Sequence, residues 1–326
     1  MVILKKQAQK DFIILNISDP QLGASEWEEG HCNRVILERT VTELIQRTNP
    51  DLITVSGDLA WAGQEKAYDM FGGFMDSFQI PWAIVWGNHD NQESAEFIEK
   101  MANKYSALKN FVYEKGDPAL GNGNYLIGIA EEGRLVETLV MMDSHDKTPF
   151  TDENGEQKMA WAKLIPNQLV WYKQQIAALK TQGCKSVTVM MHIPPYAYLQ
   201  AGKAAYKEGV NLKELALEEA VCGADCWAEG YENSCGVQYE DISCYPEEDG
   251  VFEVVKSGGL AKRILVGHDH VNNFIITYQG VQLIYALKTG AGCYWNTKLN
   301  GGTVLKVGAD GVYEVKHEFV DISDLL

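Results

Sequence analysis

Short apolar runs alternate with polar segments along this chain of 326 residues. Apolar runs of about four to eight residues that end at polar or glycine positions are typical of buried strands. The pattern predicts strands at Phe12–Ile17, Leu52–Ser56, Trp82–Trp86, Asn124–Ala130, Leu135–Met142, Ser186–Met191, Arg263–Val266, Asn273–Thr277, Val281–Ala286, Thr303–Val307 and Val312–His317. We interpret the residues before Phe12 as a short tail that leads into the first strand.

Apolar residues in two other stretches recur with the spacing of a buried helix face. The stretches cover residues 37–45 and 169–179, and Pro166 stands near the start of the second, where proline suits a first helical turn. Strands alternate with helices first and a strand-rich end follows, which indicates an α/β fold with more than one sheet. No repeat, low-complexity tract or flexible linker divides the chain. We therefore expect one domain over residues 1–326, with an acidic, cysteine-containing insertion at about residues 200–249.

Five of the predicted strands end in polar groups that can bind metal. Ligands of open α/β sheets bind beyond the carboxyl ends of the strands, so these groups are expected to converge on one rim. The groups are Asp19, Asp58, Asn88 followed by His89 and Asp90, His192, and His268 with His270 two residues on. Taken singly, each is more often a turn, cap or packed strand-end residue, and only the set is specific.

The mixture of carboxylate, amide oxygen and imidazole suits a divalent transition metal such as Mn, Fe or Zn. The number of donors is sufficient for two neighbouring ions that share a bridging carboxylate. Two ions about 3.5–4 Å apart can lower the pKa of a bridging water and hold the oxygens of an in-line displacement.

The order of these motifs resembles that of the calcineurin-like metallophosphoesterase superfamily. The motifs are Asp19-Pro20-Gln21, Gly57-Asp58, Gly87-Asn88-His89-Asp90, His192 and Gly267-His268-Asp269-His270. The GHDHVNNF stretch and Asp143-Ser144 look closest to the purple-acid-phosphatase-like branch. The resemblance implies a four-layer α-β-β-α sandwich, in which helices flank two mixed β-sheets.

The resemblance also implies a role for each matching residue. Asp58 would bridge two metal ions, Asp19 and His270 would bind one of them, and Asn88, His192 and His268 would bind the other. His89 would stand beside the leaving-group oxygen and act either as an acid or as a stabiliser of a phosphate oxygen, and Asp90 would orient His89. The implied activity is a metal-dependent hydrolysis of phosphoric esters, with metal-bound hydroxide as nucleophile and no covalent enzyme intermediate.

Two positions depart from the pattern of the resembling family. Gln21 stands where many members have His, and a neutral amide oxygen is a weaker donor than imidazole. Trp61 stands three residues after Asp58, where purple acid phosphatases carry a Tyr that colours the iron-bound protein. We therefore predict a colourless protein with one weaker metal site, held by Asp19, Asp58 and His270 with Gln21 as a further candidate ligand. The departures also motivate an alternative function, a catalytically weakened metal-binding regulatory or scaffold protein.

The charge limits the partners. Lys and Arg number 28 against 45 Asp and Glu, a net charge of −17, which disfavours nucleic acids and anionic membrane surfaces. Residues 222–249 contain eight acids and no Lys or Arg, so we expect an acidic loop near the rim. No apolar run approaches the roughly 18 residues of a membrane-spanning helix. We expect small phosphate esters, either monoesters or small diesters, as substrates, and a nuclease conflicts with this charge.

The remaining chemistry-bearing residues leave alternatives open. Cys222, Cys226, Cys235 and Cys244 form a cluster that fits structural zinc, one or two disulfides, or free thiols. A chain of this size needs no disulfides, which favours a cytoplasmic protein over a secreted form with a trimmed signal peptide. Three histidines lack a partner motif: we expect His31 at a helix start or loop, His317 in a strand, and His145 as a candidate for the rim.

Overall fold

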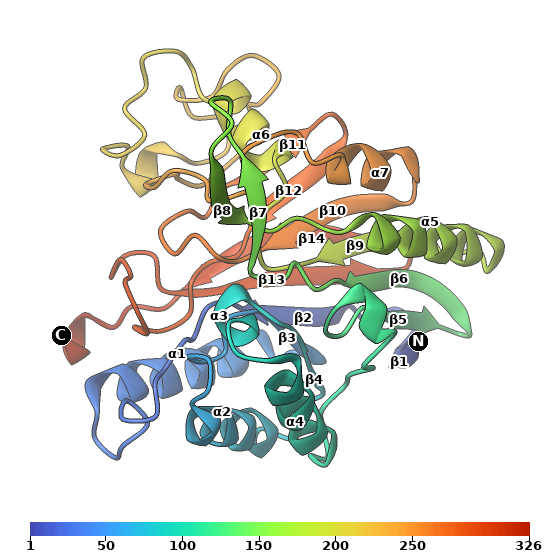
Figure 1. Cartoon of the computed structure of the whole chain (residues 1–326), viewed down its shortest axis with the longest axis vertical. Helices are drawn as coiled ribbons and strands as arrows, with labels where there is room; N and C mark the ends of the chain where they lie inside the picture. Colours follow the sequence, from blue (N-terminus) through green and yellow to red (C-terminus); the bar gives the residue numbers. More distant parts are fainter.

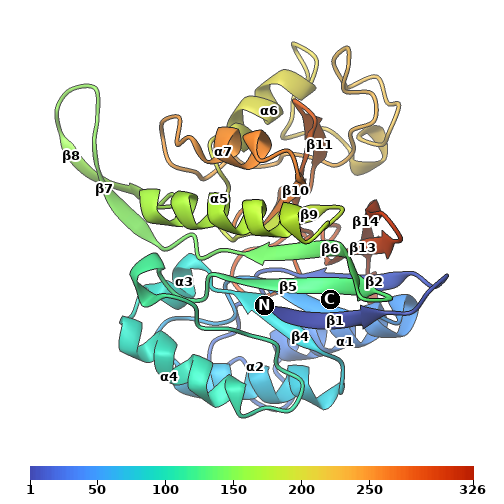
Figure 2. The same cartoon turned by 90° about the vertical axis from the view of Figure 1, so that its right-hand side faces the viewer.

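Two β-sheets pack face to face in the computed structural model, which describes all residues 1–326, and helices cover both outer faces (Figures 1 and 2). Both sheets mix parallel and antiparallel pairs. The seven-stranded sheet has the order β1 (Val2–Lys6), β5 (Tyr125–Glu131), β6 (Arg134–Met141), β9 (Val187–Met190), β10 (Ala261–Val266), β12 (Val281–Tyr285) and β11 (Ile275–Tyr278). The five-stranded sheet has the order β14 (Gly311–Phe319), β13 (Gly301–Gly308), β2 (Phe12–Ile17), β3 (Leu52–Ser56) and β4 (Trp82–Val85).

Three apolar clusters fill the spaces between the four layers. The first lies between the two sheets and includes Ile14 of β2 and Leu139 of β6. The second joins the five-stranded sheet to α1 (Cys32–Thr48), α2 (Glu65–Ser77) and α4 (Ala95–Ser106). The third joins the seven-stranded sheet to α5 (Pro166–Thr181), α6 (Ala197–Ala205) and α7 (Val251–Ser257). This arrangement confirms the expected four-layer α-β-β-α sandwich.

All eleven predicted strands are present, and each differs from the prediction by no more than two residues at an end. The interpretation of the first residues as a tail is wrong. Val2–Lys6 forms β1, which pairs in parallel with β5 at the edge of the seven-stranded sheet, whereas β2 belongs to the other sheet. Lys6 Nζ lies 3.1 Å from Glu131 Oε1 of β5, so a buried ion pair anchors this edge strand.

One hairpin was not predicted. β7 (Lys147–Thr151) and β8 (Gln157–Trp161) pair only with each other, and none of their residues is buried. Because neither strand has a buried apolar run, the hydrophobic pattern gave no signal for them. Figure 2 shows the hairpin standing out from the body on the side where α3 (Asn88–Asn91) lies.

The stretch between α6 and α7 contains turns and bridges, with one short helical turn, η2 (Leu217–Glu219). Its self-packing is clearest at Trp227, which is buried against the Tyr206 ring at a centroid distance of 4.6 Å. All seven cysteines of the chain are free thiols. Whether this stretch is an insertion within a single domain stays a prediction.

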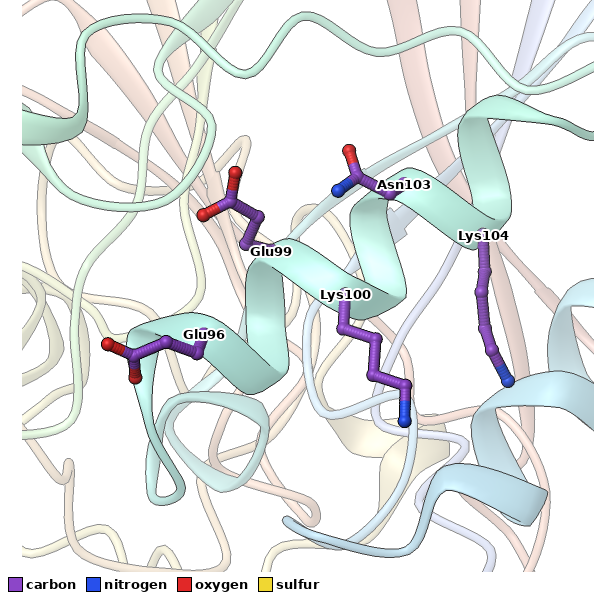
Figure 3. A pocket seen from close by; sticks show the side chains of 5 residues that line it. All are labelled: Glu96, Glu99, Lys100, Asn103 and Lys104. Carbon is purple, nitrogen blue, oxygen red and sulfur yellow. The ribbon is translucent and has the colours of Figure 1, made fainter.

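A polar hollow on α4 is drawn in Figure 3, and it contains none of the predicted site residues. Lys100 and Lys104 point to the same side of α4, and they form ion pairs with Glu65 at 2.5 Å and Asp69 at 2.6 Å on α2. The hollow is a feature of the surface of α4, whose residues Glu96, Glu99, Lys100, Asn103 and Lys104 line it. Two further short turns are η1 (Pro118–Leu120) and η3 (Ser323–Leu325). No helix combines the length and the apolar character of a membrane crossing.

Candidate metal centre

The predicted ligands follow five strand ends, three from one sheet and two from the other. β2, β3 and β4 run parallel to one another, as do β9 and β10. Contacts between the side chains beyond these ends show that both sheets contribute to one cluster. Nε2 of His192, which follows β9, lies 2.9 Å from Oδ1 of Asn88, which follows β4. The predicted convergence on one rim is therefore found, with the rim shared between the sheets.

Three donor atoms gather around His192 Nε2. Asn88 Oδ1 lies 2.9 Å away, His268 Nδ1 3.3 Å and Asp58 Oδ2 3.4 Å. The other ring nitrogen, Nδ1, lies 2.7 Å from the Ser56 carbonyl oxygen. Because a carbonyl oxygen only accepts, this contact places a proton on Nδ1 and turns Nε2 toward the cluster.

A second group of donors centres on Asp19. Oδ1 of Asp19 lies 3.5 Å from His270 Nε2, and ligand atoms of Asp19, Asp58 and His270 all lie within 4.8 Å of one another. His270 Nδ1 lies 2.7 Å from the carbonyl oxygen of Tyr294, so its Nε2 also faces the cluster. Asp58 belongs to both groups.

Two glycines of the motifs leave room for ligands from neighbouring strands. A Cβ on Gly87 would lie 2.2 Å from Asp58 Oδ1, and a Cβ on Gly267 would lie 2.8 Å from Asp19 Oδ2. Any side chain at these positions would displace a carboxylate. The close approach of the Asp58 and Asp19 carboxylates to these two backbone positions therefore explains the glycines before Asn88 and His268.

Four of the predicted site residues have a left-handed backbone: Asp19, Gln21, Asp58 and His268, with φ from 43° to 82°. Such conformations cost about 1–3 kcal/mol each for residues other than glycine and tend to occur at functional sites. Asp19 and Asp58 are tied by backbone bonds, Asp19 N to Gly57 O at 3.2 Å and Gln21 N to Asp58 O at 3.0 Å. The turns after β2 and β3 thus hold the two carboxylates together.

Burial and charge act against each other at these groups. Burial disfavours ionised Asp19, but its hydrogen bond with His270 and the charge of His192 outweigh burial and hold the pKa of Asp19 below its usual value. Burial likewise lowers the pKa of His192, whereas Asp58 and Asp19 raise it, to about 10. Burial and the charge of His192 lower the pKa of His268 to about 3. Two buried carboxylates therefore require positive charge here, which bound cations or a protonated His192 would supply.

His89 does not have the partner that was expected. Its Nδ1 lies 2.9 Å from Gln92 Oε1, and its backbone N–H donates to Asp58 Oδ1 at 2.9 Å. Asp90 instead accepts hydrogen bonds from Gly87 N at 2.7 Å, Leu59 N at 3.1 Å and the Tyr68 hydroxyl at 2.8 Å. The expectation that Asp90 orients His89 is wrong, because Asp90 is turned back to cap the amino terminus of α3.

Comparison with known proteins supports what the geometry indicates. The family model for calcineurin-like phosphoesterases matches residues 12–272.

The chain belongs to the calcineurin-like phosphoesterase family.

Similar proteins point to the same group of metallophosphoesterases. A protein named probable inactive purple acid phosphatase 28 from Arabidopsis thaliana is 25% identical over 309 residues, covering 84% of this chain and 69% of the relative. Probable inactive purple acid phosphatase 14 from the same plant is 27% identical over 315 residues, with the same shares. The crystal structure of a dimetal phosphatase from Danio rerio has a similar fold, with a TM-score of 0.55, 14% identity, and coverage of 94% of this chain and 98% of that one.

The donor set of this phosphoesterase also fits a pair of metal ions. Several of its buried polar atoms have no hydrogen-bond partner within the protein: both amide atoms of Gln21, Nδ2 of Asn88 and Nε2 of His268. Buried polar atoms are nearly always partnered, so unpartnered ones here indicate a group that the protein atoms do not supply. Carboxylate, amide and imidazole donors suit Mn, Fe or Zn.

Several residues of the centre were not predicted from the sequence. Lys288 is buried after β12, and its Nζ donates to the backbone carbonyl of Asp19 at 2.6 Å. Its only signal was a lysine directly after an apolar strand. Gln92 carried no signal beyond its position after the GNHD motif. The aromatic rings of Trp161 and Tyr294 lie against His268 and His270, and neither belongs to a recognised motif.

The three other histidines lie outside the cluster. His31 caps α1, where its Nδ1 accepts from Asn33 N, and His317 lies in β14, both as expected. His145 lies 2.9 Å by its Nε2 from Gln168 Oε1 and belongs to neither donor group.

Proposed function

We propose that this phosphoesterase hydrolyses small phosphoric esters at a centre of two metal ions. Asp19, Asp58 and His270 would hold one ion, with the Gln21 amide oxygen as a further ligand. Asp58, Asn88, His192 and His268 would hold the other. The observation that carries the proposal is the convergence of these donors, with three of them within 3.4 Å of His192 Nε2. When bound, the ions would activate a water molecule and neutralise phosphate oxygens.

His89 would act on the leaving group. Its backbone is tied to Asp58, and its Nδ1 faces the Gln92 carbonyl oxygen, which only accepts. The ring therefore carries its proton on Nδ1 when neutral and leaves Nε2 available. A protonated Nε2 would donate to the ester oxygen as the bond to phosphorus breaks, which general acid catalysis requires.

A second candidate function is a metal-binding protein with weakened catalysis. The names of the two Arabidopsis relatives describe them as probable inactive phosphatases. In this chain, Gln21 in place of an imidazole supports the same reading, because an amide oxygen binds a transition metal more weakly.

One set of measurements separates the two candidates. The purified protein is analysed for bound metal and then assayed on a generic phosphomonoester and phosphodiester with Mn, Fe, Zn and Mg added in turn. Hydrolysis with at least one metal is expected, together with one metal site weaker than the other in a titration. Metal binding without any hydrolysis would favour the second candidate, and two sites of equal affinity would contradict the role of Gln21.

The colour of the iron-loaded protein gives an independent check. Trp61 has no oxygen that could bind iron, so we expect no visible absorption band of the tyrosinate–iron type. Its ring instead lies 4.6 Å from the ring of His89. An intense visible band on addition of iron(III) would show that another phenolate binds the metal.

The role of His89 is tested by replacing it with alanine. We expect His89→Ala to retain bound metal, because only its backbone N–H contacts Asp58, and to lose about 10²–10⁴-fold in turnover. The loss should be smaller for esters with good leaving groups, which need no proton. Unchanged turnover on an alkyl ester would exclude the proposed role.

A further inference from the structure

Three aromatic rings flank the candidate centre, and each contacts a different histidine of the site. The Trp61 ring lies 4.6 Å from the ring of His89, the Trp161 ring 4.5 Å from that of His268, and the Tyr294 ring 4.2 Å from that of His270. The three rings come from the loop after β3, the end of β8 and the loop after β12. We call Trp61, Trp161 and Tyr294 the aromatic collar.

The collar is partly open to solvent. Tyr294 is 48% exposed, and Trp61 and Trp161 are half-buried. Aromatic side chains that only fill a core are normally covered, as Trp82, Trp86 and Tyr198 are here. Partly exposed rings beside the reacting groups therefore offer apolar surface to whatever occupies the site.

Two of the rings are also held from outside the centre. The hydroxyl of Tyr294 donates a hydrogen bond to Glu240 Oε2 at 2.8 Å. The ammonium group of Lys147 lies over the ring of Trp161, 4.8 Å from the ring centroid. Ordered rings lose little conformational entropy when a ligand packs on them, which makes them effective contact surfaces.

The surroundings of the collar favour a neutral flat ring over a cation as its ligand. Lys147 already places a positive charge on Trp161, which would repel a cationic group. Both carboxylate oxygens of Glu240 are engaged, Oε1 with Val271 N and Oε2 with the Tyr294 hydroxyl. A flat aromatic ring needs no charge partner and stacks on aromatic side chains whatever its substituents.

We propose that the aromatic collar binds the alcohol part of the substrate and selects phosphate esters whose alcohol carries a flat aromatic ring, either a nucleobase or an aryl group. The inference rests on the proposed function, since it names the substrate class of the same site. The phosphate group would lie at the carboxylate–imidazole cluster, and the ring of the alcohol would pack on Trp61, Trp161 and Tyr294.

The test compares esters with the same leaving oxygen and different rings. Adenosine 5′-monophosphate is compared with ribose 5-phosphate, and benzyl phosphate with cyclohexylmethyl phosphate. In both pairs the leaving group is a primary alcohol, so the bond that breaks is of the same kind and the two members differ in the flat ring. We expect kcat/KM to be about 5- to 100-fold higher for the member with the flat ring, the range that stacking on aromatic side chains supplies. The pair with the larger ratio identifies the source of the ring.

Variants of the collar are judged by that ratio and not by absolute activity. Trp161→Leu and Tyr294→Leu should bring the ratio toward one, whereas Trp161→Phe should retain most of it. Because both members of a pair use the same metal centre, any disturbance of His268 or His270 cancels in the ratio. Trp171→Leu is the matched control, since Trp171 is a half-buried tryptophan on α5, away from the site histidines.

The outcomes separate this inference from the proposed function. If all four esters are hydrolysed with a ratio near one, the role of the aromatic collar in substrate selection is overturned and the phosphoesterase activity stands. The same conclusion follows if Trp161→Leu and Tyr294→Leu leave the ratio unchanged. The rings would then serve only to hold the histidines. If no ester is hydrolysed, the proposed function fails, and the collar is tested by calorimetry of adenosine and ribose. Measurable binding of adenosine alone, lost in Trp161→Leu, would support it, and equal binding of both would overturn it.

Discussion

At the residue scale, the geometry of the metal centre depends on the close packing of single atoms, and Gly87 is the clearest example. A Cβ at this position would lie 2.2 Å from Asp58 Oδ1, a carboxylate that both donor groups share. We expect Gly87→Ala to displace Asp58 and to lower metal affinity at both positions by at least tenfold, measured by calorimetry. Gly73→Ala is the control: nothing lies within 4 Å of its added Cβ on α2, so it should stabilise the helix by about 0.5–1 kcal/mol and leave metal binding unchanged. Normal metal binding by Gly87→Ala would contradict the packing described.

A histidine outside the two donor groups should control acid stability. Burial lowers the pKa of His317 to about 4. Its Nε2 lies 2.6 Å from the Asn273 carbonyl oxygen and its Nδ1 lies 3.0 Å from the Thr303 hydroxyl. The neutral ring satisfies both contacts, with Nε2 as donor and Nδ1 as acceptor, and burial favours this uncharged form. The unfolded chain, with a histidine pKa of about 6.5, binds a proton between pH 6.5 and 4 that the folded chain does not. The free energy of unfolding should therefore fall as the pH drops through this window.

The expected size of this effect is about 1–2 kcal/mol, because His317 is only half-buried and solvent screens part of the shift. Urea unfolding at pH 7.5 and pH 4.5 measures it. His317→Gln keeps a donor for Asn273 and does not titrate, so the stability of this variant should fall less over the same interval. Other titrating groups cancel in the difference between the two proteins. Equal losses for both would show that His317 titrates normally.

At this scale the sequence predicted which residues meet, but not how each points. The nine predicted site residues come from separate motifs, and strand ends and glycines bring six of the seven expected ligands together. For Gln21, the contact is a backbone bond to Asp58. The six are Asp19, Asp58, Asn88, His192, His268 and His270. Asp90 was assigned to His89 by adjacency alone. In the single turn of α3, residues one apart point in different directions, while His89 and Gln92, three apart, lie on one face. That geometry follows from the helix, which the pattern of apolar residues did not predict.

The edge strand β1 provides the prediction at the element scale. Lys6 and Glu131 are both buried, at 6% and 7% exposure. Removing one partner of a buried ion pair leaves an uncompensated charge and costs about 3–5 kcal/mol. We expect Lys6→Met to lower the free energy of unfolding by about 3 kcal/mol and the double variant Lys6→Met/Glu131→Leu to recover most of it. Urea unfolding measures both.

An exposed ion pair supplies the control for β1. Lys100→Met breaks the pair with Glu65 on the helix surface and should cost less than about 1 kcal/mol. If Lys6→Met were as mild as Lys100→Met, the first residues would behave as the loose tail that the sequence suggested.

The elements that the sequence missed share a physical cause. Hydrophobic pattern detects elements that bury a face, and it found every strand with a buried run, including both strands that carry His192 and His268. β1 has five residues, none of its apolar residues is buried, and its partner β5 lies more than a hundred residues away. The hairpin β7–β8 has no buried residue, and its apolar and polar residues do not form a buried run. Trp161, a member of the aromatic collar, was missed for that reason.

Charge acts at the scale of the whole molecule, and its distribution is uneven. Of the net charge of −17, residues 222–249 carry −8. Part of this acidic stretch reaches the centre: Glu240 accepts from Val271 N at 2.9 Å, and Ser243 N donates to Asp269 Oδ2 at 3.0 Å, both in the loop of His268 and His270. Acids beside the site should repel a polyanion more than a small ester, because each additional phosphate adds repulsion.

Two variants with equal net charge separate local from global repulsion. Asp241→Asn/Glu247→Gln neutralises two exposed acids of the acidic stretch, and Glu132→Gln/Asp310→Asn neutralises two exposed acids in the β5–β6 and β13–β14 turns. These turns lie at the opposite ends of the strands, since β5 and β13 run antiparallel to strands that end at the centre.

Hydrolysis of a short oligonucleotide relative to a small ester is then measured at low and high salt. We expect the first variant to raise the ratio of oligonucleotide to small-ester hydrolysis several-fold at low ionic strength and the second to leave it near that of the natural protein. The gain should vanish at about 1 M salt, where the screening length falls to about 3 Å. Equal gains would assign the exclusion of polyanions to net charge alone, and no gain in either would remove the acidic stretch as a cause. A gain confined to the first variant would show that the acidic stretch is a second determinant of which substrate enters the site. The aromatic collar would select the alcohol by its shape, and the acids would select it by its charge.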